Sequence, residues 1–94
     1  MNSPEPEHLN NHHRDTLRKI FEHPVSHNIE WHEVVSLLEA VGTVDVRHDG
    51  EIVVHIGSHR EFFEAPDGKD IDEQMVVDLR TMLSGAGFGP PKAG

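Results

Sequence analysis

The chain has 94 residues, enough for one domain with a small core, and it has no Cys, which excludes disulfides, thiolate–zinc sites and cysteine nucleophiles. Its 17 acidic residues outweigh 8 Lys and Arg and give a formal charge of −9, whereas most nucleic-acid binders carry a basic surface that neutralises phosphates. It has neither the apolar stretch of a membrane span nor the cationic start and apolar core of a signal peptide, so we expect a cytoplasmic protein without membrane contact.

Polar segments without hydrophobic periodicity flank the predicted domain. Pro4 and Pro6 alternate with acidic residues at the start of the chain, and the end is rich in Gly and Pro. Such segments cannot bury enough apolar surface to offset the entropy lost on ordering. We therefore predict disordered tails over residues 1–11 and 89–94 and a single folded domain over residues 12–88.

Two amphipathic helices are predicted in the first half of the domain. The first, over His12–Phe21, has apolar residues at i, i+3 and i+4, and Pro24 ends it because the residue before proline avoids the helical conformation. The second begins after Asn28, a residue type that caps helices, and ends at Gly42, which can adopt positive φ without steric cost. Its apolar positions lie one turn apart and predict a buried face, with the single Trp as a core anchor rather than a ligand platform: Trp31, Val34, Val35, Leu38 and Val41.

Two consecutive β-hairpins are predicted after these helices. Asp49-Gly50 and Gly57-Ser58 are turn dipeptides, and they separate three runs that contain β-branched and aromatic residues. The three runs, residues 43–47, 51–56 and 59–63, predict an antiparallel meander.

The register of the first hairpin can also be predicted. A two-residue loop at Asp49-Gly50 would mix charged and apolar residues on one face, which a half-buried sheet rejects. A three-residue loop with Gly50 in the left-handed conformation groups the apolar residues and places Arg47 opposite Glu51. The predicted apolar pairs are Val46 with Ile52 and Val44 with Val54, Ile56 continues that face, and the other face carries Asp45, Val53 and His55.

The third strand has two neighbouring aromatic residues, Phe62 and Phe63. They project to opposite faces because successive side chains alternate along a strand. One ring must therefore face away from the helices that cover the sheet. That ring is either an interface residue or covered by the short N-terminal helix. We expect the second, because small domains use additional helices to cover apolar surface.

A last helix is predicted after the turn Pro66-Asp67-Gly68. Asp70 is a candidate cap, and the acids Asp72 and Glu73 suit the first turn of a helix, where the dipole favours negative charge. The predicted core face of this helix consists of Ile71, Met75, Val76, Leu79, Met82 and Leu83. Gly85 and Gly87 end the helix, and Phe88 is expected to fold back onto the core. The predicted fold is α+β with α-β-β-β-α order: two helices on one face of a three-stranded antiparallel sheet, plus the short N-terminal helix.

Nine histidines are an unusual number for a chain of this length. His8, His12 and His13 include the helical i, i+4 spacing of two metal ligands, but no carboxylate or Cys completes the set, and a solvated tail is the favoured interpretation. Imidazoles protonate near pH 6, so the histidines could also reverse much of the negative charge, and a pH sensor is a further hypothesis. We predict neither a metal site nor a cofactor.

Gly57-Ser58-His59, followed by Phe62 and Pro66-Asp67-Gly68, resembles the strand motif of HicA-type toxins. These toxins are small mRNA interferases with an α-β-β-β-α fold like that of double-stranded-RNA-binding domains. The segments 31–42 and 68–87 are also similar to the first and last helices of that family, so the resemblance covers residues 29–88. It implies that His59 is the catalytic residue.

Two departures from the HicA pattern decide the expected function. In the family, Gly-Ser-His lies at the turn after the first strand, which here is Gly50-Glu51-Ile52, and the family is basic whereas this chain is acidic. We therefore expect a non-catalytic interaction module on a HicA-like scaffold, with an unidentified protein as its partner. The alternative is a divergent HicA-like toxin that binds and cleaves RNA. His59 would then act as general base or acid, and the phosphate would be held by Arg60, or by Arg14, Arg18 and Lys19.

Overall fold

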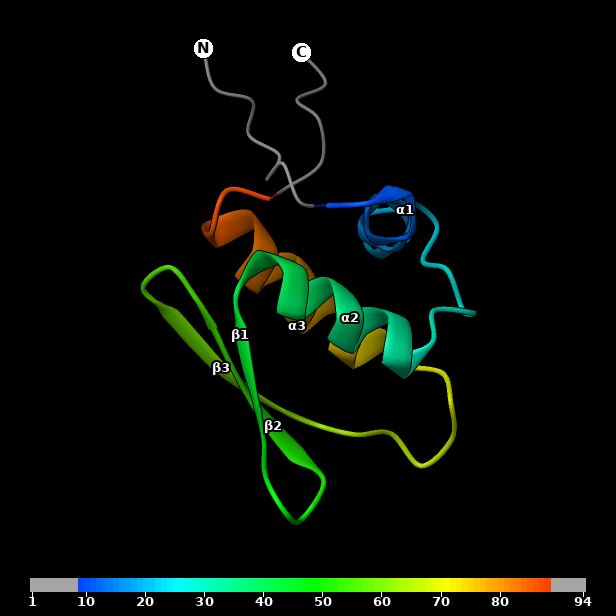
Figure 1. The fold of residues 1–94 in the computed structure, drawn as a ribbon. Helices are drawn as coiled ribbons and strands as arrows, with labels where there is room; N and C mark the ends of the chain where they lie inside the picture. Colours follow the sequence, from blue (N-terminus) through cyan, green and yellow to red (C-terminus); the bar gives the residue numbers. More distant parts are fainter. Residues whose placement is uncertain (1–8, 89–94) are drawn as a thin grey trace, which may run out of the picture.

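The fold consists of a three-stranded sheet, two helices on one face of it, and a third helix that packs on these two (Figure 1). The computed structural model describes residues 9–88. The helices are α1 (Asn11–Ile20), α2 (Trp31–Val41) and α3 (Glu73–Gly85), and the strands are β1 (Thr43–Val46), β2 (Glu51–Ile56) and β3 (His59–Glu64). The predicted α+β class and antiparallel sheet are confirmed. No helix among the described residues is long and apolar enough to cross a membrane.

The described structure begins before the first predicted helix. Leu9 is buried in the core, and the side chain of Asn10 caps α1 by accepting a 2.8 Å hydrogen bond from the backbone N–H of His13. The ring of His13 accepts in return from the backbone N–H of Asn10, which completes a capping box. α1 therefore starts one residue earlier than predicted. The rest of the two predicted tails, residues 1–8 and 89–94, lies outside the described residues.

The strand register of the first hairpin is the predicted one. The strands are neighbours in the order β1-β2-β3, and both pairs are antiparallel. Gly50 has a φ of 89°, and the N–H of Arg47 donates to the carbonyl of Glu51 at 2.7 Å, as a three-residue loop requires. The pairs that matter below are Val46 with Ile52, Val44 with Val54, Ile52 with Phe63, and Val53 with Phe62.

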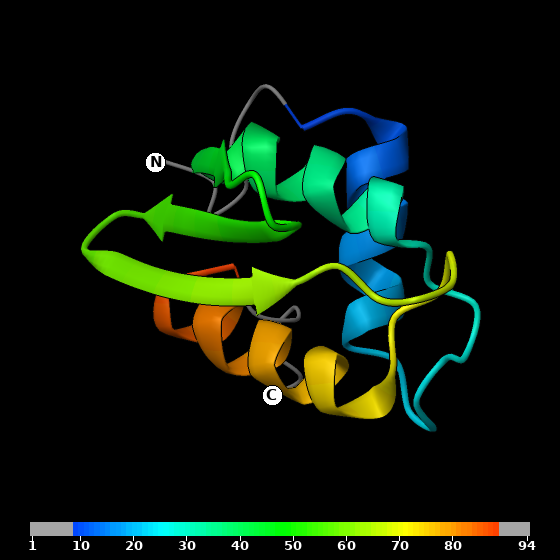
Figure 2. The same ribbon diagram turned by 90° about the horizontal axis from the view of Figure 1, so that it is seen from below.

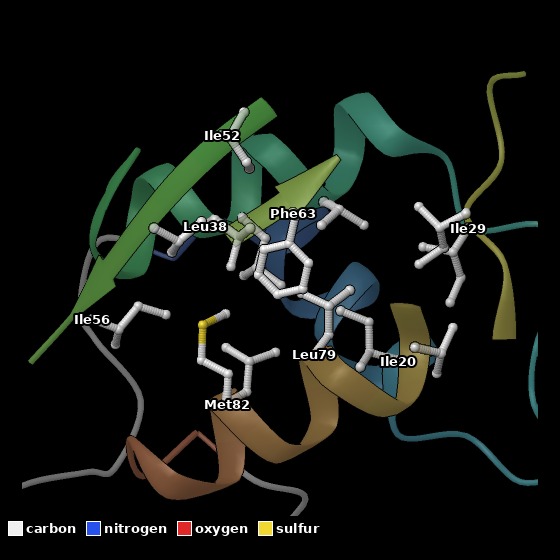
Figure 3. Close-up of a cluster of buried hydrophobic side chains, with 14 of the residues drawn as sticks. Ile20, Ile29, Leu38, Ile52, Ile56, Phe63, Leu79 and Met82 are labelled. Atoms are coloured by element: carbon white, nitrogen blue, oxygen red, sulfur yellow. The ribbon is translucent and has the colours of Figure 1, made fainter. Parts of the chain in front are cut away.

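The core lies between the sheet and the helices (Figure 3). β2 and β3 contribute Ile52, Val54, Ile56 and Phe63, α2 contributes Val34, Leu37 and Leu38, and α3 contributes Val76, Leu79, Met82 and Leu83. Removing these apolar side chains from water is the main source of stability in a domain of this size. Trp31 is half-buried and packs against this core, in agreement with its predicted role as an anchor.

The start of α2 differs from the sequence prediction. The side chain of Asn28 does not cap the helix but accepts a 2.6 Å hydrogen bond from the hydroxyl of Ser26. The helix begins at Trp31, whose N–H donates to the carbonyl of Lys69 at 2.7 Å. A backbone group far along the chain thus satisfies the helix terminus, so a local side-chain cap is not needed there.

The start of α3 also differs from the sequence prediction, again because a distant segment contacts the backbone there. Asp70 was the predicted cap, but its backbone forms an isolated antiparallel bridge with Glu30. The cap is Asp72, whose carboxylate accepts a 2.9 Å hydrogen bond from the N–H of Met75. The contact between the segments before α2 and α3 therefore fixes where both helices begin.

Gly42 ends α2 for a reason other than the predicted one. Its φ is −163°, which is extended backbone rather than the left-handed region. A Cβ at this position would lie 2.2 Å from the carbonyl oxygen of His55, so the close approach of the chain to β2 requires glycine. Positive φ is used instead at Gly87, after α3, where the N–H of Phe88 turns back to the carbonyl of Leu83 at 2.7 Å.

α1 packs on α2 and α3 and does not reach the outer face of the sheet (Figures 1 and 2). Arg80 of α3 donates from Nε to the carbonyl of Ile20 and from Nη2 to that of Glu22, both at 2.7 Å, and so holds the end of α1. The apolar face of α1, which includes the buried Ile20, is used against the two helices. The prediction that α1 covers the spare aromatic ring is therefore wrong, and Phe62 remains exposed.

Candidate interaction surface

The two faces of the sheet differ in what covers them. The inner face carries core residues beneath α2 and α3, whereas no helix within residues 9–88 lies over the outer face, which we call the open face (Figure 2). Side chains alternate between the faces along each strand. The register therefore assigns to the open face Thr43, Asp45, Glu51, Val53, His55, Arg60, Phe62 and Glu64.

Phe62 is the exposed aromatic residue of the open face. Its side chain is 47% exposed, whereas that of the next residue, Phe63, is 6% exposed. The guanidinium of Arg60 lies over the Phe62 ring, with its central carbon 5.2 Å from the ring centroid, a cation–π contact. Val53, opposite Phe62 on β2, is 4% exposed although it lies outside the main core cluster. Phe62, Arg60 and Val53 thus form a small apolar centre with one ring open to solvent.

Acidic residues surround this apolar centre. Asp45, Glu51 and Glu64 lie on the open face, and the exposed Glu61 lies on the same edge strand, β3, but on the other face of the sheet. In the part of the chain that the structure describes, ion pairs use the carboxylates of Asp15 and Glu30, and none uses these four. The three strands contain a single Lys or Arg, Arg60. A second cation, the exposed Arg47, follows β1 opposite Glu51. Acidic groups still outnumber cations at the open face, so its field is negative overall.

A groove of about 430 Å³ continues this acidic surface beyond the end of β3. It is open to solvent and is lined by the loop that joins β3 to α3 and by the start of α3. Its residues are Glu64, Ala65, Pro66, Asp67, Gly68, Asp70, Asp72 and Met75. No group of His, Cys, Asp or Glu within residues 9–88 is arranged to hold a metal ion, these carboxylates included.

His59, the residue that the HicA resemblance implies as catalytic, contacts the end of α3. Its Nε2 lies 3.0 Å from the carbonyl oxygen of Gly85. A carbonyl can only accept, so Nε2 must carry the hydrogen of this bond. The ring also packs against Gly85, where an added Cβ would lie 3.1 Å from its Cε1 atom. His59 thus ties the second hairpin to α3 and leaves Nδ1 as the ring nitrogen without this bond.

The proposed phosphate ligands are not brought together around His59. Arg60 projects to the open face, whereas His59 lies on the inner side with α3. Arg18 and Lys19 lie on α1, on the helix side of the molecule, and both pair with the carboxylate of Asp15. Arg14, on the same helix, is exposed. The geometry therefore gives no single centre that contains His59 and a cation for RNA phosphate.

Of the histidines with metal-ligand spacing, His13 has a structural partner among the described residues. His13 Nε2 lies 2.9 Å from the hydroxyl of Ser36 and so links α1 to α2. His12 is exposed on α1, and His8 lies outside the described residues.

Sequence reasoning predicted that one of Phe62 and Phe63 would face outward, but it did not say which ring, and it missed three features of this part of the molecule. It assigned Val53 to the outer face but gave no sign that the side chain would be buried there. It also missed the groove after β3 and the bond between His59 and Gly85, because both depend on how the loop and α3 fold back to the sheet. The pattern that the sequence does show, two adjacent Phe residues on one strand, is a local one.

Comparison of the chain with protein-family models, with curated proteins and with solved structures finds no match.

Proposed function

We propose that this protein is a small non-catalytic interaction module on a HicA-like scaffold, and that it binds a protein partner through the open face of its sheet. The observation that carries the proposal is the exposure of Phe62 on a face with no helix over it within the described residues. An exposed aromatic side chain beside a cation and a buried aliphatic residue is typical of the centre of a protein–protein interface, where aromatic residues and Arg are enriched.

The contact with Arg60 adds a second reason. A ring held in one position before binding loses less conformational entropy when a partner covers it. The cation–π contact of 5.2 Å supplies such a restraint from above the ring, and Phe62 is still 47% exposed. Burying that surface against a partner would contribute to affinity in the ordinary way, by removing apolar area from water.

The charge of the surface favours a protein over a nucleic acid as the partner. The strands carry three carboxylates and one guanidinium on the open face, Arg47 follows β1 opposite Glu51, and the whole chain has a formal charge of −9. Phosphate backbones would be repelled by this surface, whereas a basic protein would be attracted and steered to it.

The alternative function, a HicA-like ribonuclease, rests on His59 and the Gly-Ser-His motif. The arrangement of the molecule supports it less, because His59 donates to the Gly85 carbonyl and Arg60 projects to the other face. A titration of labelled protein with an RNA hairpin at low salt tests it, since phosphate binding is strongest there. Amide shifts around residues 57–60, and RNA cleavage lost in His59→Ala, would establish the ribonuclease and remove the first proposal.

The interaction proposal is tested by capturing partners from a lysate of the source cells with immobilised protein. Phe62→Ala should weaken capture at least about tenfold, because truncating an interface hot spot costs about 2 kcal/mol or more. Val77→Ala is the matched control: Val77 is 48% exposed, but it lies on α3 and not on the open face. A partner that is retained equally by Phe62→Ala would show that binding does not use this face.

A further inference from the structure

β3 is an edge strand of the sheet. The strand order is β1-β2-β3, so one side of β3 pairs with β2 and its other side pairs with no strand of residues 9–88. At six residues β3 is longer than β1, which forms the opposite edge with four. An unpaired edge presents a row of N–H and C=O groups to which a further strand can add.

The register shows which backbone groups of β3 are available. The N–H of Ala65 donates to the carbonyl of Gly50 at 3.3 Å, which makes these two residues a hydrogen-bonded pair. Hydrogen-bonded and non-hydrogen-bonded pairs alternate along an antiparallel ladder. Alternate residues, beginning with the one directly before Ala65, therefore direct their backbone N–H and C=O groups away from β2. These residues are Glu64, Phe62 and Arg60, the same three whose side chains lie on the open face.

The charge along this edge selects the chemistry of a strand that could add there. Glu61 and Glu64 are exposed on β3, and the groove beyond its end is lined by Asp67, Asp70 and Asp72. Placing a neutral or acidic strand beside them would desolvate carboxylates that have no ion-pair partner among the described residues. A strand with Lys or Arg would supply those partners.

A second copy of this chain is a poorer occupant. A two-fold axis perpendicular to the sheet could match Arg60 with Glu64 of another copy, but it would put both α3 helices on the same side of the continuous sheet. Figures 1 and 2 together show that α3 lies on the inner side of the sheet and extends past the β3 edge. The α3 helix of a second copy would need the same space, whereas a single added strand brings no helix to this side. The formal charge of −9 on each chain also opposes self-association.

We infer that the edge of β3 binds an extended, Lys- and Arg-rich segment of a partner protein as a fourth strand. An apolar side chain of that segment packs on Phe62, and its basic side chains pair with Glu61, Glu64 and the acidic groove. The inference rests on the proposed function and adds to it the binding mode and the chemistry of the partner.

The probe for this binding mode is a short peptide in which Lys alternates with Thr around one central Leu. Amide hydrogen exchange of the full-length protein is followed residue by residue with and without peptide. The outward-directed amides of Arg60, Phe62 and Glu64 should exchange about tenfold more slowly in the complex. Those of Glu61 and Phe63, already bonded to β2, should change little. Binding without this alternating protection would overturn the inference.

Two controls separate strand addition from simple charge attraction. The same peptide with alternate backbone amides N-methylated keeps its charge but cannot form the ladder, and it should not protect the three amides. Glu61→Lys/Glu64→Lys should weaken binding at least about tenfold, because two attractive contacts become repulsive. The matched variant Glu22→Lys/Glu39→Lys makes the same charge change at exposed residues outside the strands and should keep most of the affinity. Equal binding of the methylated peptide, or equal loss in both variants, would reduce the effect to net charge.

The outcome is distinguishable from failure of the proposed function. If the peptide does not bind but Phe62→Ala still loses a captured partner, the open face binds proteins and the strand-addition inference is wrong. If a concentration-dependent dimer protects the same three amides without peptide, the occupant of the edge is a second copy and the inference is again wrong.

Discussion

Phe62 and Phe63 are adjacent in sequence and have opposite environments. Phe63 packs on Ile52 of β2 beneath the helices and is 6% exposed, whereas Phe62 packs beside Val53 under Arg60 and is 47% exposed. The residue type is the same at the two positions, so the alternation of side chains along the strand alone decides which ring is part of the core. The inner face of the sheet therefore provides stability, and the open face is available for binding.

Val53 shows that the contrast is not simply between buried and exposed residues. It belongs to the open face, yet it is 4% exposed, because its cross-strand neighbours Asp45 and Phe62 flank it. An apolar patch of this kind is shielded in part by its own side chains. A partner that covers Phe62 would complete this shielding without any rearrangement of the fold.

The two rings give the most direct test of this contrast and the largest expected effect. Phe63→Ala should lower the free energy of unfolding by about 3–5 kcal/mol, because it removes a buried ring and leaves a cavity. Phe62→Ala, its matched control, should cost only about 1–2 kcal/mol, because it removes an exposed cation–π contact and part of the cover of Val53. Urea denaturation followed by circular dichroism measures both. Similar losses in the two variants would show that the open face is part of the stabilising core.

The sequence predicted those features of the fold that depend on local pattern. The register of the first hairpin followed from one glycine turn and the need to group Val44, Val46, Ile52 and Val54 on one face. The helix caps could not be predicted in this way, because the starts of α2 and α3 depend on a backbone bridge between Glu30 and Asp70. No signal near either residue specifies a contact with a segment so far along the chain.

The candidate site could likewise be predicted only as far as local sequence pattern determines it. Two adjacent aromatic residues on a strand required one exposed or covered ring, but the position of α1 decided between these outcomes. That position depends on Arg80, which holds the carbonyls of Ile20 and Glu22. An arginine within an amphipathic helix is normally interpreted as a solvated residue, so its role at the end of α1 had no distinctive signal.

Arg80 extends the comparison to the helix side of the molecule. Arg80→Ala should lower the free energy of unfolding by about 1.5–3 kcal/mol, because it removes a charged donor from two carbonyls at the end of α1. Hydrogen exchange should show the loss concentrated in α1, while the amides of β2 and β3 change less. Arg18→Ala is the control and should cost less than about 1 kcal/mol, since its ion pair with Asp15 is exposed. An equal loss of protection across the sheet would mean that α1 and the sheet unfold as one unit.

The smallest effect is expected from the exposed charges near the start of α2. A hydrogen bond from His32 at 2.7 Å, and then the charge of Lys69, lower the pKa of Glu30 below its ordinary value. A carboxyl with a lowered pKa stabilises the fold above its ordinary value of 4.5 and loses that contribution as the pH falls through the folded value. We therefore expect the melting temperatures of the wild type and Glu30→Gln to differ slightly at neutral pH and to converge in the acid range. A difference that persists undiminished well below pH 4.5 would show that Glu30 acts through its backbone bridge or its packing instead. The comparison with Phe63→Ala would then no longer compare a buried apolar contact with a solvated charge, because Glu30 would act through its backbone or packing.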